Sequence, residues 1–113
     1  DGTCVRGLGP VEGETMSGER VASAFKTAGL HEPRQELGHL DLIVCGFMSH
    51  SGVSTTVRRA KDYGYRCTLV EDASATRDLA FKDGVIPAAQ IHQCEMAVMA
   101  DNFACVAPTA SLI

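Results

Sequence analysis

The turn between Gly46 and Gly52 is the part of this sequence best suited to chemistry. It reads Gly-Phe-Met-Ser-His-Ser-Gly and follows an apolar run that ends at Cys45. A helix that begins after such a strand presents free backbone N–H groups and a partial positive charge, which can hold an oxygen of a bound molecule. The last position of the turn would suit an attacking sulfur or hydroxyl, but Gly52 has no side chain. The sequence therefore predicts a turn that can bind an oxyanion but lacks a nucleophilic side chain at its last position.

Ser49 and His50 are the two side chains of the turn that could attack a carbonyl or transfer a proton. Because adjacent residues normally direct their side chains apart, they form a poor Ser-His nucleophilic pair. We expect the Ser49 hydroxyl to bond to nearby backbone instead. Three roles stay open for His50: a hydrogen-bond donor in a pocket, a core histidine or an exposed side chain.

The segments around the turn are predicted to be a strand before it and a helix after it. Leu40–Cys45 is almost continuously apolar, which is typical of a strand covered on both faces in a parallel sheet. Val53, Val57 and Ala60 recur at spacings of four and three, which places them on one face of a helix that Gly64 ends. The charged residues of this helix are expected on its solvated face: Arg58, Arg59, Lys61 and Asp62.

A second strand is predicted at residues 65–70, and it ends at Glu71-Asp72-Ala73. Strand, helix and strand within about thirty residues have the length of a right-handed crossover unit. In open α/β sheets the ligand crevice lies beyond the carboxyl ends of the strands. The two candidate site segments are therefore Gly46–Gly52 and Glu71–Ala75.

The remaining segments complete an α/β fold with parallel strands. We expect irregular loop at residues 1–18, a short helix at residues 30–37, and a connection at residues 74–86 that has room for one helical turn. Pro87 then opens a helix, and Phe103–Val106 forms a last short strand. The predicted apolar stripe of that helix consists of Ala88, Ile91, Cys94 and Val98.

Composition excludes several classes of protein. The chain has 113 residues, of which 45% are hydrophobic and 21% charged, and no window approaches the ~20 apolar residues of a membrane span. Its net charge of -4 argues against a nucleic-acid partner. The five cysteines include no C-x-x-C pair, so we expect no metal, no cofactor and a reducing, cytoplasmic compartment. Cys45, Cys67 and Cys105 are expected to be buried as small hydrophobes.

A resemblance to a known family rests mainly on the run Leu42–Thr56, with shorter segments on both sides of it. The shorter segments are Pro10, Gly13-Glu14, Ala22–Phe25 with Thr27 and Leu30, Ala60, Gly64-Tyr65, Val70–Ala73 and Phe103–Leu112. Together they resemble the isochorismatase-like hydrolase family, also called the cysteine hydrolases. The resemblance implies a three-layer α/β/α sandwich around a largely parallel sheet, with Rossmann-like topology and a site at the carboxyl ends of the strands.

In the amidase branch of this family, the resemblance implies a triad of Asp, Lys and Cys, with the cysteine as nucleophile at the end of the glycine turn. The cysteine position corresponds to Gly52 and the lysine position to Glu19. The aspartate would lie on a strand before Asp1. Without a thiolate at residue 52 no thioester can form, and a carboxylate at residue 19 reverses the charge that would lower a thiol pKa. We therefore expect cysteine amidase chemistry to be absent.

The isochorismatases of the family tolerate glycine at the position of Gly52. They cleave a vinyl ether by proton transfer and need no nucleophilic sulfur, but they keep the Asp and the Lys. Glu19 could replace these groups as an acid in a dry pocket that raises its pKa, or it could be a solvated or structural residue.

Three functions are carried forward from this resemblance. The first is a hydrolase-like protein that binds a small carboxylate or amide through the backbone N–H groups of Met48 and Gly52. The second is an active non-cysteine hydrolase whose acid lies outside this sequence, and the third is a non-enzymatic assembly module. The predicted pocket residues are Phe47, Met48, Ser49, His50 and Gly52.

The length of the chain bears on its assembly. Domains of the family are longer, so we expect residues 1–113 to be one domain whose amino-terminal part is missing. The absent part would supply a central strand, and its loss would leave strand edges unpaired. Either these residues are part of a longer protein, or the chain pairs its edges with another chain; we expect a homo-oligomer.

Overall fold

The computed structural model describes residues 40–113, and the predicted strand-helix-strand unit is present in it. Strand β1 (Asp41–Phe47) leads into the π-helical turn η1 (Ser49–Val53), which continues into helix α3 (Ser54–Asp62). Strand β2 (Arg66–Ala75) follows. The predictions for Glu19, for the loop at residues 1–18 and for the helix at residues 30–37 lie outside the described residues.

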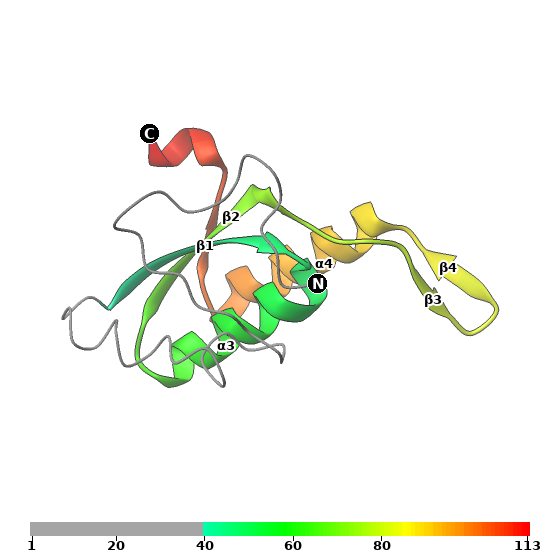
Figure 1. Cartoon of the computed structure of the whole chain (residues 1–113), viewed down its shortest axis with the longest axis horizontal. Helices are drawn as coiled ribbons and strands as arrows, with labels where there is room; N and C mark the ends of the chain where they lie inside the picture. The colour runs from blue at the N-terminus through cyan, green and yellow to red at the C-terminus, as the bar shows by residue number, and fades with distance from the viewer. Residues whose placement is uncertain (1–39) are drawn as a thin grey trace, which may run out of the picture.

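The main sheet has three parallel strands in the order β1-β2-β5, with β5 at Cys105–Ala107 (Figure 1). Leu42 pairs with Cys67, and Thr68 pairs with Cys105 on the other side of β2. This arrangement confirms the predicted α/β class with parallel strands. It also brings the carboxyl ends of β1 and β2 to the same edge of the sheet, where the candidate site was expected.

Strand β2 carries extra residues close to that edge. Val44 of β1 pairs with Leu69, but Gly46 pairs with Ser74, so β2 advances five residues while β1 advances two. The Ser74 hydroxyl donates to the Val70 carbonyl at 2.9 Å and closes the irregularity. Such a bulge redirects the residues it contains. Here it carries the segment 71–73 out of the regular ladder.

Helix α4 (Ala88–Asn102) and helix α3 cover the same face of the sheet, as Figure 1 shows. Val57 and Ala60 of α3, Leu69 of β2 and Met99 of α4 are completely buried between these elements. The apolar spacing predicted for α3 is therefore confirmed. Gly64 ends that helix with φ of +86°, a conformation that glycine adopts without a Cβ clash.

The apolar stripe predicted for α4 is wrong. The buried residues of this helix are Met96 and Met99, whereas Cys94 and Val98 are exposed. The helix carries apolar residues on most of its circumference, so their spacing alone does not identify the face that packs on the sheet.

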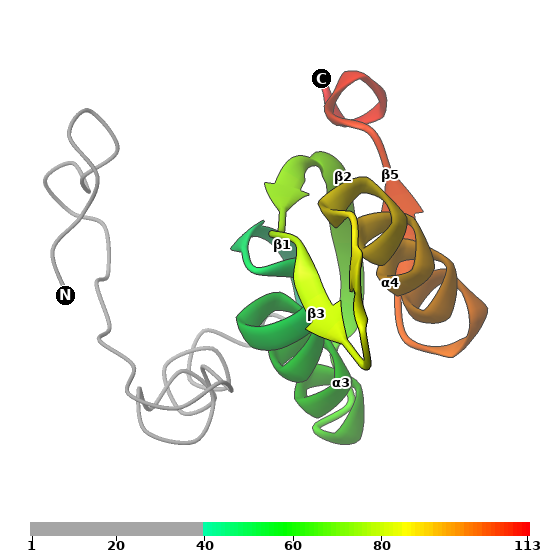
Figure 2. The ribbon, with the colours of Figure 1, turned by 90° about the vertical axis from the view of Figure 1, so that its right-hand side faces the viewer.

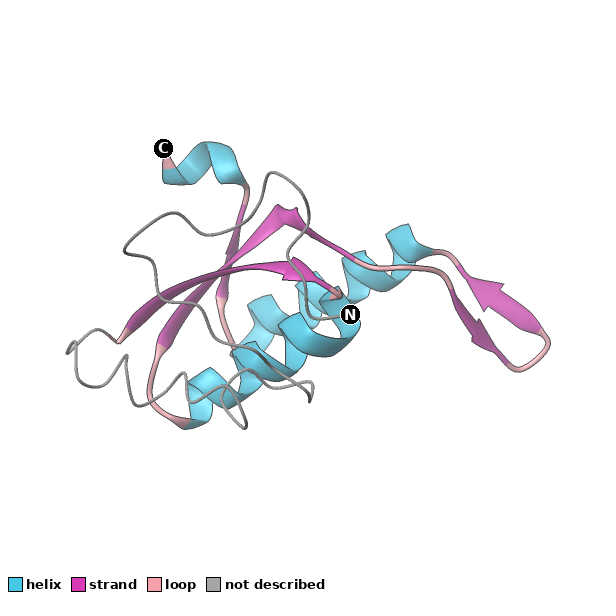
Figure 3. Cartoon of the chain, viewed as in Figure 1, coloured by secondary structure: helices cyan, strands magenta, loops and turns pink. Residues whose placement is uncertain are grey.

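The connection predicted at residues 74–86 is mostly strand. It contains the end of β2 and a two-stranded antiparallel hairpin, β3 (Leu79–Phe81) and β4 (Gly84–Ile86), with no helical turn (Figure 3). The chain reverses at Lys82, whose φ is +55°. Pro87 lies just before α4, and the Asp78 carboxylate accepts a hydrogen bond from the Ala88 N–H at 2.7 Å. This contact satisfies one of the free donors at the helix start.

Within residues 40–113, the face of β1 opposite the helices is open. Ile43 is 68% exposed and Phe47 is 71% exposed. The expectation that β1 is covered on both faces is thus not met by the described residues. Cys45 and Cys105 are also exposed, contrary to prediction, and only Cys67 of the three lies in the core, where burial raises its pKa. None of the described helices is long and apolar enough to cross a membrane.

Core packing in the sheet gives a direct test. We expect Leu69→Ala to lower the free energy of unfolding by about 2–5 kcal/mol, since it removes a completely buried side chain. The matched variant Leu112→Ala changes a leucine that is 41% exposed, and its effect should be within about 0.5 kcal/mol. Urea unfolding measures both, and equal losses would contradict the core assignment.

Candidate functional site

The predicted turn is a compact backbone loop between β1 and α3. The peptide bond between Phe47 and Met48 is cis. The Met48 carbonyl then accepts hydrogen bonds from the Ser51 N–H at 2.9 Å and from the Val53 N–H at 3.2 Å. These bonds wrap residues 49–53 into the π-helical turn, with Gly52 half-buried in it. The sequence expectation of a strand, a tight turn and a helix start is confirmed here.

Ser49 bonds to a distant side chain and not to local backbone as predicted. It is completely buried, and its hydroxyl lies 2.7 Å from Nδ1 of His92 on α4. Nε2 of His92 lies 2.9 Å from the Glu71 carbonyl oxygen in the bulge of β2. One histidine thus connects the turn after β1 to the irregular end of β2.

The hydrogen-bond partners of His92 indicate which of its two ring nitrogens carries the proton. A carbonyl oxygen can only accept, so Nε2 of His92 must donate to Glu71. In the neutral ring Nδ1 is then an acceptor, and the Ser49 hydroxyl donates to it. A serine, a histidine and a third orienting group are the parts of a nucleophilic site. Ser49 is completely buried, so its hydrogen bond to His92 fixes the position of the turn.

His50 occupies the outer side of the same turn. It is half-buried, and its Nδ1 contacts the Thr76 hydroxyl at 2.5 Å. Thr76 directly follows β2, so this contact ties the turn to the second strand. Of the three roles left open by the sequence, the structure shows a partly exposed polar contact and not a core histidine.

A cleft of about 350 Å³ opens beside this network, between the end of β2 and α4. Its lining residues are Glu71, Asp72, His92, Gln93 and Met96. The second candidate segment of the sequence, residues 71–75, therefore contributes to a concave surface. His92 is shared between this cleft and the contact with Ser49, which places the two candidate segments side by side.

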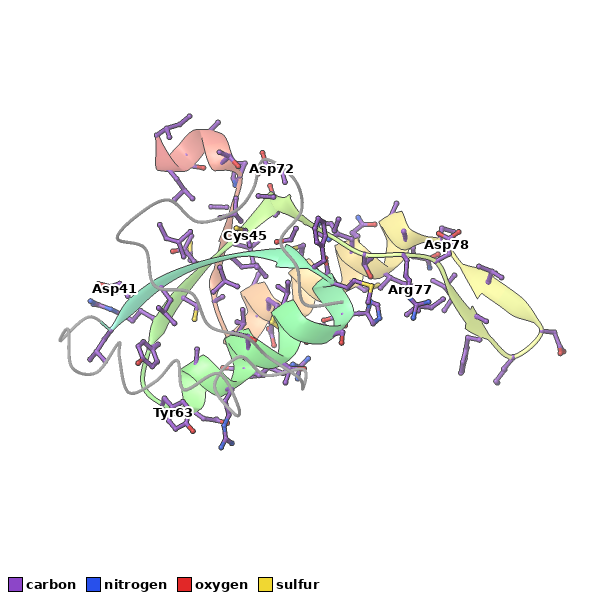
Figure 4. All side chains as sticks on the ribbon, in the orientation of Figure 1. Asp41, Cys45, Tyr63, Asp72, Arg77 and Asp78 are labelled. Atoms are coloured by element: carbon purple, nitrogen blue, oxygen red, sulfur yellow. The ribbon has the colours of Figure 1, made fainter. Side chains whose placement is uncertain are left out.

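Asp72, labelled in Figure 4, connects the end of β2 to the segment that follows β5. One carboxylate oxygen accepts from the Thr109 hydroxyl at 2.7 Å and from the Thr109 N–H at 2.8 Å, at the start of the short helix η2 (Thr109–Leu112). These two hydrogen bonds favour the charged form and lower the pKa of Asp72.

The structure separates the five predicted pocket residues into different environments. Ser49 lies in the interior, Met48, His50 and Gly52 are half-buried, and the Phe47 side chain projects into the open. Sequence reasoning missed His92, which is 43 residues from Ser49 and lies in a largely apolar helix where a histidine resembles a core residue. No group of three metal-ligating side chains occurs in the described part of the chain.

Comparison with known proteins identifies the family. The Isochorismatase domain model matches residues 3–111. The chain belongs to the isochorismatase family. It is 38% identical over 104 residues to the uncharacterized isochorismatase family protein YddQ of Bacillus subtilis, a match that covers 92% of this chain and 58% of YddQ.

Solved structures agree with this assignment. An isochorismatase from Pseudomonas putida KT2440 is 82% identical, with a TM-score of 0.95 over 98% of this chain and 57% of that protein. A cysteine hydrolase from Pseudomonas syringae, 22% identical with a TM-score of 0.93, shares the fold over 97% of this chain and 52% of its own. The chain thus spans a little over half the length of these relatives. The α/β/α family fold implied by the resemblance is confirmed.

The hydrogen bond between Ser49 and His92 can be tested by a double-mutant cycle. Ser49→Ala leaves a buried acceptor of His92 without its donor, so we expect a loss of about 1–3 kcal/mol in the free energy of unfolding. Combined with His92→Phe, the two losses should fall short of additivity by at least about 0.5 kcal/mol. Ser111→Ala, at an exposed serine of η2, is the control. Strict additivity would show that the pair contributes no coupling.

The Asp72 contact predicts a pH effect. Thr109→Val removes the hydroxyl but keeps the backbone donor, so the pKa of Asp72 should rise toward its ordinary value. Because the folded pKa is lowered, the stabilisation from this carboxylate is present above the unfolded pKa of about 4. It is lost as pH falls through the lower folded pKa. Carboxyl NMR titration measures the change, and an Asp72 pKa equal in both proteins would contradict it.

Proposed function

We propose that this chain binds a small carboxylate or amide at the turn Phe47–Gly52 and lacks the cysteine amidase chemistry of its family. One observation carries the proposal. Hydrogen bonds to the Met48 carbonyl and between Ser49 and His92 hold the turn in place, while Gly52, at the expected position of the nucleophile, has no side chain. Family membership supports a hydrolase-like scaffold. A hydrolase scaffold without its sulfur retains the geometry for binding and loses the covalent step.

Backbone groups would carry the binding. The N–H groups of Met48 and Gly52 are the proposed donors to the ligand oxygen. The helical segment that starts at Ser49 and continues through α3 has no acidic residue in its first turns, so its positive end is not neutralised by its own side chains. A carboxylate or a polarised carbonyl is the chemical class that this end favours. The pair His50 and Thr76 would supply polar contacts beside it.

A second function is favoured by glycine at residue 52. Family members that cleave vinyl ethers need no sulfur at this place, and the 82% identical structure from Pseudomonas putida is described as an isochorismatase. In this alternative the acid is Glu19 or a group outside the given sequence. Turnover of a vinyl ether by the natural protein, lost after Glu19→Gln, would favour this alternative over simple binding.

We also propose a cytoplasmic setting for the chain. The four cysteines of the described region, Cys45, Cys67, Cys94 and Cys105, are free. Free thiols, three of them exposed, support a reducing and hence cytoplasmic compartment.

Ligand titration followed by backbone NMR tests the binding proposal. With small carboxylates and the matching amides we expect the amide signals of residues 47–53 to shift. Gly52→Asp places a negative charge where the ligand oxygen would bind, so carboxylate affinity should fall at least about tenfold through charge repulsion. Ser111→Asp adds the same charge on η2 and should leave the affinity unchanged.

The absence of cysteine chemistry is tested in the same preparation. The unaltered protein should hydrolyse no amide, and Gly52→Cys alone should remain inactive because Glu19 stands at the lysine position. Amide turnover by the unaltered chain, or shifts confined to residues far from 47–53, would overturn the proposal.

A further inference from the structure

Arg77 is an exposed cation on the connection between β2 and β3, where Figure 4 labels it. Within residues 40–113 its guanidinium forms no ion pair, no hydrogen bond and no contact with an aromatic ring. Every other lysine and arginine of this region has such a partner. Arg58 and Lys61 lie over the ring of Phe103, Arg59 lies over Tyr63, Lys82 lies over Phe81, and Arg66 pairs with Asp41. Arg77 is therefore the positive charge of the described region that is free to bind something else.

The backbone at Arg77 lies beside the turn that follows β1. In Figures 1 and 2 the connection from β2 to β3 passes the end of β1. Phe47 pairs with Ala75 there, and the hydroxyl of Thr76 contacts Nδ1 of His50 at 2.5 Å. Arg77 is the next residue, with its Cα about 3.8 Å from that of Thr76. Its long methylene stem lets the guanidinium reach a molecule that is held at the turn.

A carboxylate that approaches this edge of the sheet meets unfavourable charge. The chain has a net charge of -4, and Glu71 and Asp72 line the cleft at the end of the same strand. Backbone N–H groups at a helix start supply only partial positive charge. Asp78 follows Arg77, but its carboxylate accepts from the Ala88 N–H and forms no ion pair with the guanidinium. A bound carboxylate thus needs a full positive charge beside the turn, and Arg77 supplies one.

We infer that Arg77 makes the turn selective for carboxylates over neutral amides. The inference rests on the proposed binding at the turn and says which of the two ligand classes is preferred. A guanidinium can donate two parallel hydrogen bonds to one carboxylate, and such charge-assisted bonds are about twice as strong as bonds between neutral groups. The carbonyl oxygen of an amide can accept from the same N–H groups, but it brings no negative charge. Arg77 is in this sense a specificity-determining residue.

Paired titrations test the selectivity. The unaltered protein is titrated with propionate and propionamide, and with benzoate and benzamide, and the NMR shifts of residues 47–53 give each dissociation constant. We expect each carboxylate to bind at least about tenfold more tightly than its amide. The Nε–H signal of Arg77 should shift with the carboxylates and stay in place with the amides.

Substitutions separate Arg77 from the overall charge of the protein. Arg77→Gln should lower carboxylate affinity at least about tenfold and leave amide affinity unchanged, whereas Arg77→Lys keeps the charge without the planar fork and should retain part of the preference. Lys82→Gln removes the same charge from the hairpin and should keep the full preference. Because the guanidinium of Arg77 has no partner to lose within residues 40–113, Arg77→Gln should unfold at the temperature of the unaltered protein.

Three results overturn the role of Arg77 while binding at the turn stands. They are equal affinity of the unaltered protein for a carboxylate and its amide, a preference that survives Arg77→Gln, and a loss in Lys82→Gln as large as that in Arg77→Gln. No shift of residues 47–53 with any of the four probes overturns the proposed binding itself, and this inference with it.

Discussion

The hydrogen-bonded chain from Ser49 through His92 to the Glu71 carbonyl holds together the edge of the sheet at the carboxyl ends of β1 and β2. Each of its three members comes from a different element: the turn after β1, helix α4 and the bulge of β2. A buried hydroxyl that loses its partner costs more than an ordinary hydrogen bond gains, so the network specifies one relative position of these elements. The turn, the bulge and the helix must therefore be considered as one unit.

The bulge in β2 determines how this edge is used. Its extra residues present the Glu71 carbonyl to His92, while Asp72 accepts two hydrogen bonds from Thr109. The same short segment thus lines the cleft, orients a histidine and fixes the end of the chain. In a regular parallel ladder the Glu71 carbonyl would be paired within the sheet and would not be free to accept from His92.

Much of this scaffold could be predicted from sequence, because its signals are local. Alternating or continuous apolar runs identified the parallel strands, and the spacing of Val53, Val57 and Ala60 identified the buried face of α3. The family resemblance implied that Gly52 corresponds to the position of the nucleophile. The hairpin of β3 and β4 was missed because its two strands have only three residues each and lie in a connection that resembles a loop.

The sequence by itself determined the class of fold, the strand-helix-strand order around the turn, the family and the absence of a side chain at Gly52, since these depend on residue type and short-range spacing. Only the tertiary structure decided that Ser49 is paired with His92, that α4 buries Met96 and Met99 instead of Cys94 and Val98, and that the hairpin β3-β4 projects from the rest of the described residues. These outcomes depend on contacts between residues far apart in the chain. An apolar helix has several equivalent faces until a sheet packs against one of them.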